Sequence, residues 1–309
     1  MGEGRLCIIG GEKSESNIKL IEEAKKRFDS VFFVPISGIH IGLTDRFSIT
    51  YRTTDLLKFD AILPRIPRYF SSYAYQLLSL FPEDTFMAIK PISFLLACER
   101  FFLLTVLRKR NIETINLRLT HTKNAALRVL EENGFPLIIR TPNKKTGVFV
   151  ANETEAKTII DAFTALKQPI LIEDVIKDMV SVYVVEPEVI GAVKKRSEEK
   201  DIVFSKGKIK SFKLKPEIEQ LALDAAKSIE AQIARVDITT SDIPKVVNVE
   251  LNPNLITPSK VMGKNIVEKL IKNVYENYKA HKEKPVLIKF FEDAKSVMKD
   301  VLKGKQIMI

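Results

Sequence analysis

The sequence predicts an α/β protein that begins with a parallel-sheet domain and continues into a small α+β lid and a central α+β domain. In residues 1–91, short apolar runs alternate with stretches of helical period, which favours a mainly parallel sheet. In residues 118–178, helical and strand-like segments are mixed in an α+β pattern. Closer to the C-terminus, two apolar runs meet at a polar turn, which indicates a hairpin.

The elements follow from periodicity, and we divide the chain into residues 1–91, 92–280 and 281–309. Strands are predicted over Arg5–Ile9, Val31–Val34, Asp60–Leu63, Phe86–Ile89, 136–141, 147–151 and 169–174. Helices are predicted over Ile18–Phe28, Ser71–Leu80, Ser93–Lys109, 122–133, 153–166, 215–231 and 264–279.

The C-terminal extension has its own pattern. Apolar residues in Pro285–Leu302 recur at the spacing of an amphipathic helix. Such a helix either packs on its own chain or forms a contact between subunits, so a homo-oligomer is one of two open interpretations.

Composition places the chain among ordinary globular proteins, because 45% of its 309 residues are hydrophobic and 28% are charged. No run approaches the ~18 apolar residues of a membrane span, and Met1–Gly10 lacks the pattern of a signal peptide. Cys7 and Cys98 lie in apolar stretches, which favours free thiols in a reducing compartment. We therefore expect a cytoplasmic protein.

The net charge of +10 predicts anionic partners such as ATP, an acidic small molecule, an acidic protein tail or nucleic acid. The basic residues are spread along the chain, with no arginine-rich block between aromatic residues and no tryptophan. Nucleic acid is therefore the least expected of these partners.

The hairpin near the C-terminus carries the main candidate site. In Val246–Pro253, apolar and polar residues alternate, so Glu250 and Asn252 point to the same face. Folding the hairpin brings Asp237 near them, and two carboxylates with an amide oxygen make an all-oxygen site that suits Mg²⁺. The alternative is a half-buried hairpin whose polar side faces solvent.

The spacing of Asp237, Glu250, Asn252 and Pro253 resembles the magnesium-binding end of the ATP-grasp superfamily, and more narrowly the RimK-like carboxylate–amine ligases. Other segments resemble the same family, in its order. They are Phe59–Ile66 (N-terminal domain), Phe135–Arg140 with Thr146–Val150 (first ATP strand and phosphate loop), Leu171–Ile176 (adenine hinge) and Val184–Arg196 (central hairpin).

This resemblance implies an ATP-grasp fold and an ATP- and Mg²⁺-dependent ligase, with Mn²⁺ as a possible substitute, that joins an acid to an amine through an acyl phosphate. The acid would be a small molecule, a glutamate-terminated cofactor or a protein C-terminus, and the amine an amino acid. By resemblance, Asp237, Glu250 and Asn252 hold the metal. Glu173 accepts from the adenine amino group, and the main chain of Ile176 pairs with the adenine edge.

The chain departs from the family pattern where ATP phosphates would bind. Arg100 and Arg140 stand where the family has lysines; they are either phosphate ligands or solvated surface arginines. The phosphate loop Pro142–Gly147 has a single glycine. There Lys145 and its neighbour Lys144 either supply charge or form an exposed basic turn.

Two further departures concern phosphoryl transfer. Met179 and Ser181 replace the Asp and Arg of the family's Asp-x-Arg, with Asp178 as a candidate for the ribose contact. The family's Arg-x-Asn segment is missing after Arg196, which makes Lys194, Lys195 and Arg196 the nearest cations; Lys194 and Arg196 are our catalytic candidates. The alternative function is a catalytically weakened nucleotide-binding or interaction protein that keeps the fold.

Overall fold

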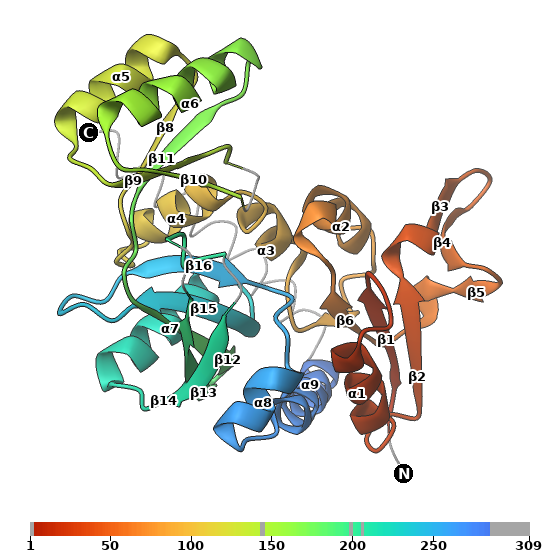
Figure 1. Ribbon diagram of the computed structural model, residues 1–309. Helices are drawn as coiled ribbons and strands as arrows, with labels where there is room; N and C mark the ends of the chain where they lie inside the picture. Colours follow the sequence, from red (N-terminus) through yellow and green to blue (C-terminus); the bar gives the residue numbers. More distant parts are fainter. Residues whose placement is uncertain (1–2, 143–145, 198–199, 205–206, 285–309) are drawn as a thin grey trace, which may run out of the picture.

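The structure is a computed structural model, and it describes residues 3–142, 146–197, 200–204 and 207–284. The chain forms a parallel sheet, two larger antiparallel sheets and a short three-stranded sheet, with helices packed around them (Figure 1). Among the described residues, no helix combines the length and apolar character needed to cross a membrane. The expected α/β class with three parts is confirmed, while the predicted C-terminal helix Pro285–Leu302 lies outside the described residues.

The N-terminal part is a parallel sheet of order β2-β1-β6-β7. Gly10, which ends β1, pairs with Arg65, which ends β6, so both residues lie at the carboxyl edge of the sheet. The strands and helices are β1 Arg5–Gly10, α1 Glu15–Ala24, β2 Ser30–Pro35, β6 Ala61–Arg65, α2 Ser71–Leu78 and β7 Phe86–Met87.

A small antiparallel sheet, which periodicity did not predict, is inserted before β6. It consists of β3 His40–Leu43, β4 Phe47–Tyr51 and β5 Thr54–Asp55. Figure 1 shows it projecting from the side of the parallel sheet.

The single helix predicted over Ser93–Lys109 is wrong, because the structure has α3 Pro91–Leu96 and α4 Arg100–Lys109 instead. The Glu99 carboxylate accepts a hydrogen bond from the Phe101 amide and so caps a new helix. Arg100 therefore stands at the first turn of a helix rather than in the middle of one.

The lid is an antiparallel sheet of order β10-β9-β11-β8, with α5 and α6 packed side by side on it (Figure 1). It has its own apolar core, which includes Leu130, Ile139 and Ile160. Its elements are β8 Leu117–Thr120, α5 Lys123–Glu132, β9 Leu137–Arg140, β10 Val148–Val150, α6 Glu153–Ala165 and β11 Ile170–Asp174.

The central sheet has the order β14-β13-β12-β15-β16 and is antiparallel throughout. Its core is continuous with that of the N-terminal part. The elements are β12 Met179–Val185, β13 Glu188–Arg196, β14 Lys208–Phe212, α7 Pro216–Ser228, β15 Ile233–Thr239, β16 Val246–Glu250, α8 Ile256–Met262 and α9 Ile266–Glu283.

Helix α9 connects the central part back to the N-terminal part. Tyr275 and Tyr278 of α9 pack against Phe28, with ring centroids 5.1 Å and 5.6 Å away. These contacts lie at the amino edge of the parallel sheet, since Phe28 lies just before β2.

Candidate nucleotide and metal site

The β15–β16 hairpin presents a polar face at its centre. Asp237 pairs with Asn248, and Arg235 pairs with Glu250. Because paired residues of antiparallel strands point to the same side, and residues two apart on a strand do as well, all four share one face. We name this set, Arg235, Asp237, Asn248 and Glu250, the carboxylate face.

Asp237 is fully buried at the centre of this face. Its Oδ1 accepts a 2.6 Å hydrogen bond from the Ser181 hydroxyl, and its Oδ2 accepts from Asn248 Nδ2 at 3.1 Å. Arg235 Nη2 lies 2.9 Å from the same Oδ2. The charge of this carboxylate is thus stabilised by three donors, as a buried anion requires.

Glu250 lies at the more open end of the face and is half-buried. Its Oε1 accepts from the backbone amide of Asn252 at 3.3 Å, two residues after the end of the strand. Two of the predicted metal ligands, Asp237 and Glu250, therefore share a sheet face, and Asn252 contacts Glu250 through its main chain.

The N-terminal part contributes two arginines from 180 or more residues away, one at the end of β6 and one in the short 3-10 helix Arg68–Phe70. Arg65 is buried and donates from Nη2 to the Pro253 carbonyl at 2.7 Å. Burial lowers the pKa of Arg65 to about 10, although the nearby Glu250 opposes this shift. Arg68 donates from Nη2 to Asn248 Oδ1 at 3.0 Å and to the Val249 carbonyl at 2.8 Å.

The donor set fits Mg²⁺ better than a softer metal. Within the part of the chain that the structure describes, no group of three or more His, Cys, Asp or Glu side chains could hold a metal. Mg²⁺ needs only one or two carboxylates, because water and substrate phosphates supply its other ligands. Asp237 and Glu250 meet that requirement, provided that a cation displaces one of the donors that Asp237 now has.

A second charged cluster joins the lid to the central sheet. Glu173 of β11 forms ion pairs with both Arg100 and Arg140, and Arg140 Nη2 lies 2.7 Å from Asp201 Oδ2. The ring of Phe204 lies over both guanidinium groups, with its centroid 4.9 Å from Arg140 Cζ and 5.5 Å from Arg100 Cζ. We name these five residues the arginine cluster.

The interpretation of Arg100 and Arg140 as surface arginines is wrong, because their side chains are only 2% and 1% exposed. Burial lowers the pKa of Arg100, and the Glu173 carboxylate offsets part of that shift. Arg100 Nε also donates to the Val247 carbonyl of β16 at 3.0 Å. The arginine cluster and the carboxylate face are therefore attached to the same strand.

The remaining nucleotide candidates lie between β11 and β13. Asp178 forms an ion pair with Lys194, so the structure brings two predicted residues together. Burial acts to raise the pKa of Asp178, but hydrogen bonds from Lys194 and Thr240 outweigh it and lower the pKa below its ordinary value. Ile176 lies in the loop that connects β11 to β12. Lys145 lies outside the described residues.

The three cations at the end of strand β13 point to different faces of the central sheet. Lys194 pairs with Val180, which in turn pairs with Ile238, so Lys194 points away from the carboxylate face, and so does Arg196 two residues on. Lys195 alternates to the same side as Asp237, and its Nζ donates to the Val203 carbonyl at 3.3 Å. Sequence periodicity places Lys194 and Lys195 on opposite faces, but only the register with β12 identifies which face is which.

Sequence reasoning also missed Asn248, Arg235, Arg65 and Arg68. The alternation that selected Glu250 applies equally to Asn248, so a signal for that residue was present. No local pattern connects Arg65 or Arg68 to β16, since the contacts arise only from the packing of two distant segments.

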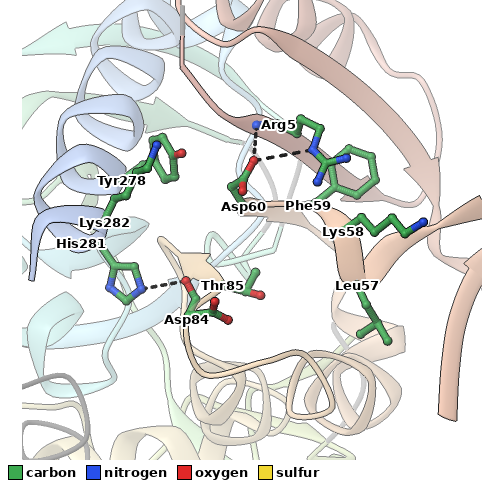
Figure 2. A pocket seen from close by; sticks show the side chains of 10 residues that line it. All are labelled: Arg5, Leu57, Lys58, Phe59, Asp60, Asp84, Thr85, Tyr278, His281 and Lys282. Carbon is green, nitrogen blue, oxygen red and sulfur yellow. Dashed lines mark hydrogen bonds and ion pairs between the residues drawn. The ribbon is translucent and has the colours of Figure 1, made fainter. Parts of the chain in front are cut away.

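A separate pocket of about 430 Å³ lies at the opposite, amino edge of the parallel sheet. Figure 2 shows Arg5 paired with Asp60 on one side and His281 bonded to the backbone of Asp84 on the other. Because Arg65 and Gly10 end their strands at the other edge, this pocket is distinct from the candidate site.

Comparisons with known proteins identify the family of this chain. The pattern of the RimK-like ATP-grasp domain matches residues 97–274. A probable alpha-L-glutamate ligase of Pseudomonas syringae pv. tomato is 30% identical in an alignment of 281 residues, which covers 84% of this chain and 92% of that protein.

Two solved structures share the fold. The ATP-grasp ligase PsnB complexed with its precursor peptide PsnA2 and AMPPNP superposes with a TM-score of 0.70 at 15% identity, covering 90% of this chain and 100% of that one. A RimK domain protein from Sphaerobacter thermophilus gives 0.69 at 16% identity, covering 87% and 98%. The chain belongs to the RimK-like ATP-grasp family, and the ATP-dependent ligase function that its sequence predicts is confirmed at that level.

Proposed function

We propose that this protein uses ATP and Mg²⁺ to join a carboxylate of an acidic acceptor to the amine of glutamate or a similar amino acid. One observation carries the proposal. The carboxylate face and the arginine cluster meet on β16, where Arg100 binds the Val247 carbonyl and Asp237 binds Asn248. A cation-binding face beside two buried guanidinium groups suits a nucleoside triphosphate and the metal ion that accompanies it.

The reaction has two steps. A carboxylate oxygen of the acceptor attacks the γ-phosphorus of ATP; the bond to the β,γ-bridging oxygen breaks and ADP leaves. The amine nitrogen then attacks the acyl carbon, phosphate leaves with the carbon–oxygen bonding pair, and the nitrogen releases a proton to solvent. Water must be kept from the acyl phosphate between the two steps.

Each residue receives one role in this proposal. Asp237 and Glu250, with Asn252, hold Mg²⁺ or Mn²⁺, which when bound neutralises charge on the phosphates. Arg100, Arg140 and Lys145 bind phosphate oxygens. Glu173 and the main chain of Ile176 contact adenine, and Asp178 contacts ribose. Lys194 and Arg196 remain proposed cations for the acyl phosphate, although β13 turns both away from Asp237.

The net charge of the protein supports the choice of acceptor acid, and the name of a relative supports the choice of amine. A net charge of +10 favours an acid with more than one carboxylate, such as a small di-acid, a glutamate-terminated cofactor or an acidic protein C-terminus. The relative from Pseudomonas syringae is named a glutamate ligase, which supports glutamate as the amine.

A weakened relative is the second candidate, and one observation favours it. Arg140 is paired with both Glu173 and Asp201, and Phe204 covers it, so its charge is already satisfied within the protein. An arginine held in this way can be purely structural.

The test measures ADP released by the protein with ATP, Mg²⁺, glutamate and a panel of di-acids and glutamate-terminated peptides, and traps the acyl phosphate with hydroxylamine. Glu250→Gln should lower the acceptor-dependent release of ADP by about 10²–10³-fold. In other enzymes, removal of one preorganised polar group from the active site has an effect of this size. Asp242→Asn is the matched control, because it lies exposed in the turn of the same hairpin. Equal release by wild type and Glu250→Gln would contradict the metal assignment. Failure of the wild type to bind a non-hydrolysable ATP analogue would favour the second candidate.

A further inference from the structure

Arg235 occupies an unexpected position for a residue beside a metal site. It lies on β15 two residues before Asp237 and directly opposite Glu250. Its Nη2 contacts Asp237 Oδ2 at 2.9 Å. Its buried Nε has no hydrogen-bond partner among the residues that the structure describes. The side chain is 24% exposed, so it is not sealed from solvent as Asp237 is.

The charge on Arg235 is firmly held. A guanidinium group stays protonated in proteins, and this one contacts Asp237 while Glu250 lies directly opposite it. Burial raises the pKa of the neighbouring Tyr183 to about 12, so Tyr183 remains a neutral phenol at physiological pH. The face thus carries one permanent cation between two carboxylates.

A metal ion and this guanidinium group compete for the same oxygen. When a cation binds Asp237 Oδ2, repulsion and the loss of its acceptor drive Arg235 from its present place. The nearest new anion is then the phosphate chain that the metal accompanies. A planar guanidinium group matches two phosphate oxygens, and Arg235 keeps spare N–H donors for them.

The other nearby cations are less suited to this contact. Arg65 is only 2% exposed and is bonded to the Pro253 carbonyl, so it cannot reach a ligand without leaving the core. Lys195 shares the face but donates to the Val203 carbonyl. Ser181, which stands where the family pattern has its phosphoryl-binding arginine, instead donates its hydroxyl proton to Asp237.

We propose that Arg235 is a catalytic residue that binds the transferred γ-phosphoryl group from β15, in place of the arginine that Ser181 lacks on the neighbouring strand. Before the substrates bind, Arg235 neutralises Asp237. During the first step it contacts oxygens of the phosphoryl group as that group passes from ADP to the acceptor carboxylate. This inference rests on the proposed function and deepens it.

Calorimetric titration of wild type, Arg235→Gln and Arg235→Lys with AMP-PNP and with ADP, each in the presence of Mg²⁺, tests the proposal. Only AMP-PNP carries the γ-phosphoryl group. Arg235→Gln keeps a donor for Asp237, and it should weaken AMP-PNP about 10- to 100-fold while changing ADP affinity less than about twofold. Arg235→Lys should lie between wild type and Arg235→Gln, because it keeps the charge without the planar fork.

Two further variants sharpen the test. Ser181→Arg combined with Arg235→Gln moves the cation to the neighbouring strand and should recover most of the lost preference for AMP-PNP. Arg5→Ala is the matched control, since its exposed pair with Asp60 lies at the other edge of the parallel sheet. Equal weakening of both nucleotides by Arg235→Gln, or no weakening of either, would overturn the proposal and leave Arg235 as a counter-ion of Asp237. Absence of AMP-PNP binding in the wild type would instead refute the proposed function.

Discussion

The arginine cluster and the carboxylate face differ in charge balance and in access to solvent, because two arginines match two acids in the first and one arginine faces two acids in the second. The first centres on Arg100, Arg140 and Glu173, whose side chains are no more than 2% exposed. The second centres on a buried Asp237 but opens through the half-buried Arg235 and Glu250. Both are neutralised by their own protein partners. If a nucleotide and its metal bind as proposed, they exchange ion-pair partners in both regions, and the exchange is easier where the partner is already half-exposed.

The largest expected effect is a loss of stability when the buried ion pairs of the arginine cluster are broken. Glu173→Gln leaves Arg100 and Arg140 without their shared carboxylate, and removal of one partner from a buried ion pair costs about 3–5 kcal/mol. Urea unfolding followed by circular dichroism measures this loss of the free energy of unfolding. Asp174→Asn is the matched control, because that neighbouring side chain is 47% exposed in its pair with Arg118. A loss below about 1 kcal/mol in Glu173→Gln would mean that water reaches the cluster.

A smaller effect, on nucleotide affinity, tests whether ion-pair partners are exchanged in the arginine cluster. Asp201 is 16% exposed and pairs with Arg140, so it would compete with the phosphate that we propose for this arginine. Asp201→Asn should therefore tighten binding of AMP-PNP about threefold to tenfold, which corresponds to roughly 1 kcal/mol. Calorimetry measures the change, and Asp161→Asn, an exposed lid residue paired with Lys123, serves as the control. Weaker binding in Asp201→Asn would show that this carboxylate supports the nucleotide site instead of competing with it.

The smallest effect concerns the ion pair of Asp178 with Lys194, which lies outside both regions. The pKa of Asp178 lies below its ordinary value of 3.8 in the folded protein, so the pair with Lys194 stabilises the fold above that pH. This contribution is lost as the pH falls through the lowered pKa. Because the Asp178 side chain is 44% exposed, Asp178→Asn should cost less than about 1 kcal/mol near neutral pH. Urea unfolding at about pH 7 and about pH 3 checks this; a difference that grows on acidification would contradict it.

Sequence reasoning succeeded where local periodicity carries the information. The alternation in Val246–Pro253 placed Glu250 on a polar face, and the folded hairpin puts Asp237 on that face as well. Apart from β8, which was missed, the lid elements were predicted to within a few residues, because their apolar patterns are strong and their helices have clear caps, such as Asn152 before α6.

It failed where the answer depends on register or on distant packing. The irregularity between Asp237 and Ile238 sets which residues of β15 and β16 lie opposite each other, and no sequence pattern reveals it. The break before α4 depends on one carboxylate, Glu99, whose capping role competes with continued helix. The partners of Arg65 come from a segment far along the chain.

The hydrogen bond from Arg68 to Asn248 has an evolutionary consequence. Arg68 holds the Asn248 side-chain oxygen, so that the amide nitrogen is directed at Asp237. A change at residue 68 would free the amide to rotate and present its oxygen to a carboxylate, and a change at residue 248 would leave the arginine without one of its acceptors. Two positions 180 residues apart should therefore vary together among descendants of this chain, with neither drifting alone.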